Sequence, residues 1–274
     1  MTRVMVLTGC ASGIGLHLTG ALAARGDRVL ATDVDLDALE KRAREGAWES
    51  KGIKYKKLDV RSAEDWEAAL DSAAAAWGFV DVVMNIAGVL RPGYVQSLTA
   101  ADIDFHMDVN VKGTALGLRA AAARMIPRRS GHIVNFGSLA SLAPVPGLSL
   151  YTASKFAVRG LSLAAATELK PHGVAVTVVM PDAVQTPMLD LQVHYDEAAL
   201  TFSGDRPLTV EDVERLVLTK VLTQKPLEVA FPLSRGALAR AANTAPGVTS
   251  LIAPMLLQRG LATQERVRGG KKGS

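Results

Sequence analysis

The feature that most restricts the fold is a regular alternation of short apolar segments and amphipathic segments along the first third of the chain. Apolar runs typical of strands cover residues 3–8, 28–33, 53–58 and 81–85, and segments with helical spacing of apolar residues lie between them. Strands and helices that alternate in this way form a parallel sheet with helices on both faces. The sequence therefore predicts an α/β protein with one doubly wound parallel sheet.

Each of these four predicted strands ends at a glycine or a polar residue. The residues at the strand ends are Gly9, Asp33, Asp59 and Asn85. Ligands of open parallel sheets bind beyond the carboxyl ends of the strands. We therefore expect these four residues to lie along one ligand-binding edge.

A glycine-rich turn joins the first predicted strand to the first predicted helix. It reads Thr8-Gly9-Cys10-Ala11-Ser12-Gly13-Ile14-Gly15, with G-x-x-x-G-x-G spacing. The glycines let the backbone approach a pyrophosphate, and the helix N-terminus offers free N–H groups and the positive end of a dipole. The turn predicts a dinucleotide site, with Cys10 as a small filler rather than a reactive thiol.

Asp33 indicates which dinucleotide binds. It ends the second strand, 18 residues after Gly15. A carboxylate at this position accepts hydrogen bonds from the adenosine ribose hydroxyls and repels a 2′-phosphate. The turn contains no Lys or Arg, so the pattern favours NAD(H) over NADP(H). The alternative role of helix N-cap fits Asp35 better than Asp33.

The rest of the chain continues the pattern to seven strands. Further strands are expected at 131–135, 174–180 and 227–233. Two helical pieces with Asn110 between them are expected within 99–127, and further helices at 151–170 and 211–223. Residues 188–208 are expected to form a loop with a short helix. Residues 234–274 are predicted to be a helical extension, with helices at 234–242 and 248–258 and a basic tail containing Arg266, Arg268, Lys271 and Lys272.

Tyr151 and Lys155 are spaced to share one face of a helix. A free tyrosine titrates near ~10, and an adjacent cation lowers that pKa. Ser138 follows the fifth predicted strand, where its hydroxyl can hydrogen-bond a substrate oxygen beside the tyrosine. A Tyr-x-x-x-Lys pair alone is a common coincidence. Its functional interpretation is supported here by the residues at the strand ends.

Together these motifs resemble the short-chain dehydrogenase/reductase family over residues 3–233. The motifs are TGxxxGxG at 8–15, Asp33, Asp59-Val60, Asn85-x-Ala87-Gly88, Asn110, Ser138 and YxxxK at 151–155. The resemblance implies an NAD(P)-dependent Rossmann-fold domain at 1–233. It implies that Tyr151 is the acid/base, that Ser138 polarises the carbonyl and that Asn110 fixes a water in a proton relay. Lys155 would lower the pKa of Tyr151 and hold the nicotinamide ribose.

The same resemblance implies the contact residues. Those expected to bind the cofactor are Gly9, Ser12, Gly13, Ile14, Gly15, Asp33, Asp59, Val60, Asn85, Ala87, Gly88, Tyr151, Lys155, Pro181, Val184 and Thr186. Those expected to bind the substrate are Ser138, Ala140, Val145, Tyr151 and Met188, with further apolar wall from Leu90, Leu139, Leu189 and Leu191.

Two positions depart from the family pattern. Ile86 replaces an asparagine, which is a mild change. Asp182 replaces a glycine after the sixth strand. Asp182 is either a local turn residue, since Asp tolerates a left-handed backbone, or a carboxylate near the reacting ring that affects substrate choice.

The predicted activity is hydride transfer between NAD(H) and a secondary alcohol or ketone. The apolar walls indicate a lipophilic substrate such as a steroid, a long-chain keto compound or a cyclic alcohol. Three alternatives stay open: a non-catalytic NAD-binding scaffold, an NADP(H)-dependent ketone reductase of lipid metabolism, and a peripheral membrane or lipid-carrier role through residues 234–268.

Composition narrows the setting. The single cysteine excludes an intramolecular disulfide and favours a reducing, cytoplasmic compartment. The sequence contains no stretch of about 20 apolar residues, so no transmembrane helix is expected. The net charge of +4 comes from dispersed basic residues and does not indicate nucleic-acid binding, and the five histidines lack ligand spacing, so no metal is expected. Alanine-rich segments at 114–125 and 153–167 predict a homodimer or homotetramer.

Overall fold

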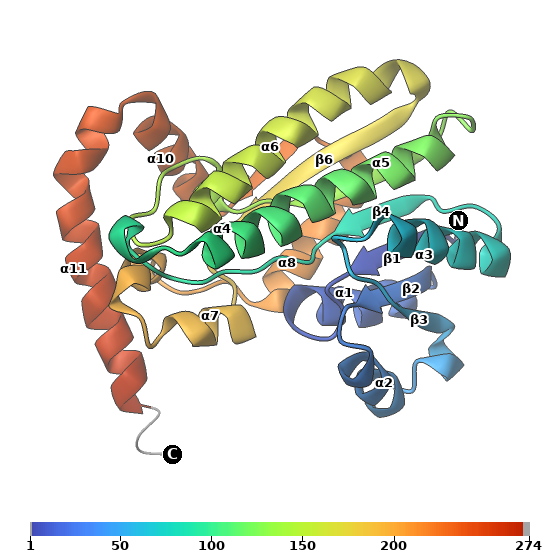
Figure 1. Cartoon of the computed structure of the whole chain (residues 1–274), viewed down its shortest axis with the longest axis horizontal. Coiled ribbons are helices and arrows are strands. Elements are labelled where there is room, and N and C mark those ends of the chain that lie inside the picture. Colours follow the sequence, from blue (N-terminus) through green and yellow to red (C-terminus); the bar gives the residue numbers. More distant parts are fainter. Residues whose placement is uncertain (1, 271–274) are drawn as a thin grey trace.

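The computed structural model describes residues 2–270, and its centre is a seven-stranded parallel sheet (Figure 1). The strand order is β3-β2-β1-β4-β5-β6-β7. The predicted fold class is therefore confirmed. The strands are β1 Val4–Thr8, β2 Arg28–Asp33, β3 Ile53–Lys57, β4 Val82–Asn85, β5 Gly131–Phe136, β6 Val174–Pro181 and β7 Glu228–Phe231.

Two layers of helices cover the sheet because successive strand residues point to opposite faces. In β1, Met5 and Leu7 pack into one core and Val4 and Val6 into the other. The first core is closed by α1 Gly13–Ala24, α2 Leu36–Glu45 and α8 Val210–Leu216. The second is closed by α3 Ala63–Trp77, α5 Gly113–Met125 and α6 Ser149–Leu169.

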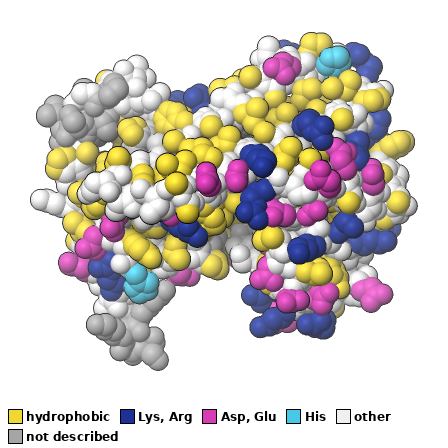
Figure 2. All heavy atoms as spheres, in the orientation of Figure 1, with side chains coloured by type: hydrophobic (Ala, Val, Ile, Leu, Met, Phe, Trp, Pro, Cys, Tyr) yellow, Lys and Arg dark blue, Asp and Glu magenta, His cyan; other side chains and the backbone are white. Residues whose placement is uncertain are grey.

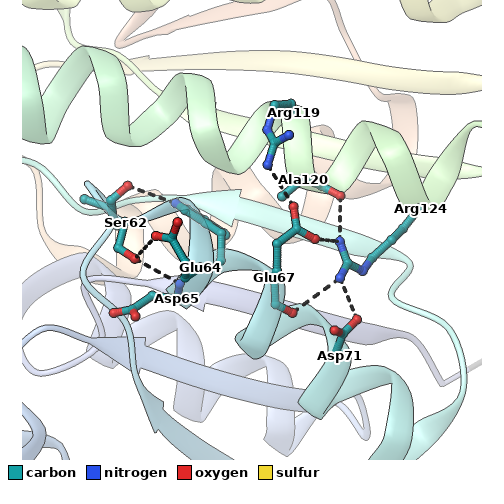
Figure 3. Close-up of polar contacts among 10 residues, drawn as sticks. Ser62, Glu64, Asp65, Glu67, Asp71, Arg119, Ala120 and Arg124 are labelled. Atoms are coloured by element: carbon teal, nitrogen blue, oxygen red, sulfur yellow. Dashed lines mark hydrogen bonds and ion pairs between the residues drawn. The ribbon is translucent and has the colours of Figure 1, made fainter.

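Helices α3 and α5 lie side by side and are joined by ion pairs (Figure 3). Arg124 contacts Glu67 at 2.6 Å and Asp71 at 2.5 Å. Such exposed pairs contribute at most about 1 kcal/mol each. Steric fit matters more here, since a Cβ at Gly117 would lie 2.2 Å from Asn85 Oδ1 and 2.5 Å from the Trp66 ring. The glycine therefore allows α5 to approach the sheet.

Asn110 lies in a widened helical turn. Helix α4 covers Ala100–His106, a π-helical segment covers Met107–Lys112, and α5 follows without a break. The two predicted helical pieces are thus joined by a π segment, a feature frequently found at functional sites. Residues 210–224 repeat this arrangement, with α8, a π segment at Val217–Val221 and α9 Leu222–Gln224.

Residues 187–203 form short helices, in agreement with the expected loop with a short helix. Helix α7 covers Pro187–Gln192, and a 3-10 segment covers Asp196–Ser203. Both lie beside the C-terminal helices at one end of the molecule (Figure 1).

The C-terminal extension consists of α10 Leu233–Thr244 and α11 Pro246–Gly270. The predicted end of the last helix at residue 258 is wrong. The helix continues because its later turns are anchored: Gln264 Nε2 donates to the carbonyls of Gln192 at 3.1 Å and Tyr195 at 2.9 Å, and Arg268 Nε donates to Val193 O at 2.7 Å. Lys271 and Lys272 of the predicted basic tail lie outside the described residues.

Helix α11 packs closely against residues 196–203. A Cβ at Gly260 would lie 2.0 Å from the carbonyl oxygen of Ala199. The spacing of Leu251, Ile252, Met255, Leu256 and Leu257 in the sequence predicts one apolar side on this helix. Met255 is exposed and Leu256 and Leu257 are half-buried, while the side chains of Leu251 and Ile252 lie outside what the structure describes. The extension therefore covers the segment after α7.

The visible surface carries charges of both signs. In Figure 2, basic and acidic side chains are intermixed on the side that holds α2 and α3. Across residues 2–270, no helix is both long and apolar enough to cross a bilayer.

Candidate active site

Tyr151, Ser138 and Lys155 line one cavity of about 240 Å³. Ser138 lies just beyond the end of β5, and the other two are one turn apart on α6. The Ser138 hydroxyl accepts a hydrogen bond from Ala140 N at 3.1 Å and hydrogen-bonds with the Tyr151 phenol. The structure thus brings together the three residues that the sequence predicts to do the chemistry.

The ionisation of this group differs from the expectation. Burial raises the pKa of Tyr151 to about 12, against the lowering effect of the Ser138 hydrogen bond, and burial lowers the pKa of Lys155 to about 8. The predicted lowering of the Tyr151 pKa by Lys155 is therefore wrong for the chain alone. Burial is the dominant cause, and Lys155 Nζ, 5.6 Å from the Tyr151 ring centre, donates to Phe136 O at 2.8 Å.

Asn110 ties a loop to helix α6. Its Oδ1 accepts from Val89 N at 2.8 Å, and its Nδ2 donates to Val89 O at 3.0 Å and Ser154 Oγ at 2.9 Å. Ser154 in turn donates to the carbonyl of Tyr151 at 2.7 Å. Both amide hydrogens of Asn110 are thus committed to protein atoms. This side chain positions the loop and α6, and only its remaining acceptor capacity is free for the expected water relay.

A second cavity of about 430 Å³ adjoins the first along the carboxyl ends of the strands. Ile14, Gly88 and Thr186 line both cavities. Of the predicted cofactor residues, those lining the second cavity are Gly9, Ser12, Gly13, Ile14, Gly15, Asp33, Asp59, Val60, Ala87, Gly88 and Thr186. Tyr151, Lys155, Pro181 and Val184 line the first.

Asn85 is the exception among the predicted cofactor residues. Its side chain is buried, and its Nδ2 donates to Asn135 Oδ1 at 2.7 Å on the neighbouring strand. The side chain therefore lies between the sheet and helix α5 and does not reach the cleft. The strand-end argument places the backbone of Asn85 correctly, but it does not determine on which face of the sheet a side chain lies.

The glycine turn fits a dinucleotide phosphate. Gly9 and Gly13 have φ of 72° and 54°, a conformation that favours glycine. A Cβ at Gly15 would lie 2.1 Å from Gly9 O. The Ser12 side chain does not cap α1, so the first amides of that helix stay available to an anion.

Two backbone amides hold the Asp33 carboxylate in place. Ala11 N donates to Oδ2 at 2.9 Å and Asp35 N donates to Oδ1 at 3.1 Å. Sequence reasoning missed the cation beside it: Arg42 Nε of α2 donates to Ala11 O at 3.3 Å. Arg42 lies nine residues beyond Asp33, outside the glycine turn that was searched for basic residues. A search of the helix that follows Asp33 would have found it.

Arg61 is a second cation that sequence reasoning missed in the cleft. Its guanidinium donates to Asp59, with Nη2 at 2.6 Å from Oδ2 and Nε at 2.9 Å from Oδ1. Hydrogen bonding to Arg61 holds the pKa of Asp59 below its usual value. The Asp59 position is therefore a neutralised pair at the edge of the cleft.

The substrate-side cavity has the predicted apolar wall with one correction. Ala140, Val145, Met188, Leu90, Leu139 and Leu189 all line it. Leu191 does not, because it lies on the outer side of α7 with 46% of its surface exposed.

Comparison with known proteins decides the family. The family model described as short chain dehydrogenase matches residues 3–195. This chain belongs to the short-chain dehydrogenase family. It is an oxidoreductase with the Rossmann-like fold of that family.

The relatives of this short-chain dehydrogenase include enzymes with hydroxy substrates. The 2-(R)-hydroxypropyl-CoM dehydrogenase of Xanthobacter autotrophicus is 36% identical over 202 residues, which is 72% of this chain and 80% of the relative. The 3-alpha-(or 20-beta)-hydroxysteroid dehydrogenase of Mycobacterium tuberculosis is 35% identical over 189 residues, 69% of this chain and 71% of the relative. A short-chain dehydrogenase/reductase from Burkholderia phymatum, solved in complex with NAD, superposes with a TM-score of 0.80 at 25% identity and covers 90% of this chain and 95% of its own.

In this short-chain dehydrogenase, the departure at Asp182 has a partner in the extension. Arg235 Nε of α10 donates to Asp182 Oδ2 at 2.6 Å, and both residues line the cavity that contains Tyr151. Asp182 is not among the non-glycine residues with a left-handed backbone, which in the described chain are Ala47, Arg129 and Lys225. Its carboxylate is therefore an ion-pair partner, and a left-handed turn does not explain the residue.

Proposed function

We propose that this protein interconverts a secondary alcohol and a ketone with NAD(H), and that its substrate is lipophilic. The observation that carries the proposal is the junction of two cavities. Tyr151, Ser138 and Lys155 lie in an apolar cavity that adjoins a glycine-lined cleft ending at Asp33. A reacting carbon at that junction lies between a proton donor and a dinucleotide site.

The residues of the chain account for the proton chemistry. Ser138 and Tyr151 share a hydrogen bond, so both hydroxyls can contact one substrate oxygen. Because the pKa of Tyr151 is raised to about 12, its phenol is protonated at neutral pH and is ready to donate to a ketone oxygen. A bound nicotinamide would supply the hydride acceptor or donor.

The reverse reaction, alcohol oxidation, needs the phenolate. Forming it at pH 7 costs at most about 7 kcal/mol, from five pKa units at about 1.36 kcal/mol each. A positive charge brought close to the phenol reduces that cost. Lys155 is the nearby cation on α6, and we propose that it also holds the nicotinamide ribose. We therefore expect ketone reduction to proceed at neutral pH and alcohol oxidation to speed up as the pH rises.

Preference for NAD rests on the fixed carboxylate of Asp33, which accepts hydrogen bonds and carries a negative charge. Arg42 near the same turn favours the alternative, an NADP(H)-dependent reductase, because its charge offsets part of the repulsion of a 2′-phosphate. We propose NAD because Arg42 is itself paired with Glu45 at 2.8 Å.

We further propose a cytoplasmic homodimer or homotetramer. Burial raises the pKa of the Cys10 thiol to about 12, so this thiol is inert, as its proposed role as a filler requires. Ala120 and Ala121 of α5 are buried within the chain itself and so do not face a second copy. Any interface on α5 therefore uses its outer residues.

One experiment tests the proposed activity. Purified protein is incubated with a panel of secondary alcohols and ketones and each of the four nicotinamide cofactors, and absorbance at the NAD(P)H band is followed. We expect turnover of cyclic or long-chain substrates with NAD(H). Cofactor binding without turnover across the panel would support the non-catalytic alternative.

A further inference from the structure

The C-terminal extension supplies a charged group to the substrate cavity. Arg235 lies beyond residues 3–195, the part of the chain that matches the family model. It nevertheless lines the same cavity as Tyr151 and Ser138. Its side chain is 26% exposed, and that of Asp182 is 18% exposed. The ion pair is thus a half-buried polar spot in a largely apolar wall.

The guanidinium has more donors than partners. It carries five N–H bonds. Nε donates to Asp182 Oδ2 at 2.6 Å and Nη2 makes a long contact of 3.5 Å with Ser203 Oγ. Among the described residues, the other three N–H bonds have no acceptor. By contrast, the nearby Thr201 hydroxyl donates to Gln192 Oε1 at 2.9 Å.

We propose that Arg235 is a specificity-determining residue that donates a hydrogen bond to a second oxygen of the substrate, away from the reacting carbon. The substrate class is then a lipophilic hydroxyketone or diketone. This inference rests on the proposed function and deepens it. A hydrocarbon end placed against Arg235 would remove water from its donors without replacing the hydrogen bonds, which is unfavourable.

The charge balance selects a neutral oxygen rather than an anion. Asp182 already balances the charge of Arg235 at 2.6 Å, and a substrate carboxylate would compete with it. A carbonyl or hydroxyl oxygen can use the remaining donors while the ion pair stays intact. Asp182 acts through Arg235, as a positioning residue that holds the guanidinium against the cavity wall.

The test compares binding of matched ketones to the NAD-loaded protein by titration calorimetry. The pairs have one, two and four rings: cyclohexanone with 1,4-cyclohexanedione, 2-decalone with decalin-2,6-dione, and 5α-androstan-3-one with 5α-androstane-3,17-dione. Three lengths are used so that one pair spans the distance from Tyr151 to Arg235. We expect the diketone of at least one pair to bind roughly tenfold more tightly than its monoketone.

Variants assign that preference to Arg235. In Arg235→Met the ratio of diketone to monoketone affinity should fall to about one, and Arg235→Lys should restore part of the preference. The matched control is Arg240→Met on the same helix, which pairs with Glu228 and does not line the cavity. It should keep the wild-type preference.

Two results would overturn the inference: equal affinities within every pair in the wild type, or a diketone preference that survives in Arg235→Met. Turnover of the same ketones with NADH is measured in parallel. If the binding preference is present and turnover is absent, the proposed function fails while the role of Arg235 stands.

Discussion

Histidine 132 should make the stability of this protein sensitive to mild acid. The residue is buried in β5, and burial lowers its pKa to about 3, with charges of Lys225 and Arg3 adding to the effect. Its tautomer follows from the contacts. Thr177 donates its only hydroxyl hydrogen to Pro226 O at 2.6 Å, so His132 Nε2 must be the donor in the 2.8 Å contact with Thr177.

This tautomer explains why protonation is unfavourable. His132 Nδ1 carries no hydrogen, is buried and has no hydrogen-bond partner among the described residues. A proton added there would be a buried charge without an acceptor. In the unfolded chain the same histidine titrates near 6.5.

The sign and size of the effect follow by linkage. The unfolded chain binds this proton at a higher pH than the folded one, so stability is complete above about pH 6.5 and falls as the pH drops toward 3. Between pH 7 and pH 4.5 the loss from this residue should be about 2.5 kcal/mol. Stopping at pH 4.5 keeps most carboxylates ionised.

The assay is urea unfolding followed by the fluorescence of the buried tryptophans Trp48 and Trp66 at several pH values from 7 to 4.5. His132→Gln keeps a donor for Thr177 and removes the titration. The free energy of unfolding of the wild type should fall by about 2.5 kcal/mol more than that of the variant. Other histidines contribute equally to both proteins and cancel. Parallel pH profiles for the two proteins would refute the reasoning.

Three further predictions follow from the cleft, the extension and the assembly. Catalytic efficiency with NAD should exceed that with NADP by at least roughly tenfold, about 1.4 kcal/mol, and Asp33→Ala should narrow the gap; equal efficiencies in the wild type would contradict it. Either Gly260→Val or removal of residues 234–274 should reduce turnover of bulky substrates, because α11 can then no longer pack on Ala199. NAD binding, measured by fluorescence titration, should be unchanged. Full activity and an unchanged number of subunits in the truncated protein would favour a lipid-binding role. Light scattering at micromolar concentration should give a dimer or tetramer mass, and a monomer mass would disprove the assembly.

Sequence patterns predicted the sheet and most of the cleft for a clear physical reason. Strand periodicity and glycine turns are local, and parallel strands bring their carboxyl ends to one edge, so Gly9, Asp33 and Asp59 were placed together without any tertiary information. The same logic placed Ser138 at this edge, whereas its partnership with Tyr151 came from the family resemblance. Asn85 shows its limit, since the face on which a side chain lies depends on the packing of α5 through Gly117.

The remaining features depend on contacts that no local pattern encodes. The pKa of Tyr151 is raised by its burial in the cavity, and the Lys155 ammonium donates to Phe136 O rather than to the phenol. The length of α11 depends on anchors to residues 192–196, which are some seventy positions earlier in the chain. The sequence showed only that Asp182 stands where the family has a glycine, and it gave no sign that Arg235 pairs with it.

The most direct test of the central claim is the effect of Tyr151→Phe on hydride transfer with NADH and a ketone substrate. Loss of the proton donor should lower kcat by about 100-fold or more, with the Kd for NADH unchanged. Tyr195→Phe, which alters a tyrosine exposed outside the cavity, is the matched control and should keep wild-type activity. A Tyr151→Phe protein that retains wild-type kcat would contradict the assignment of Tyr151 as the proton donor.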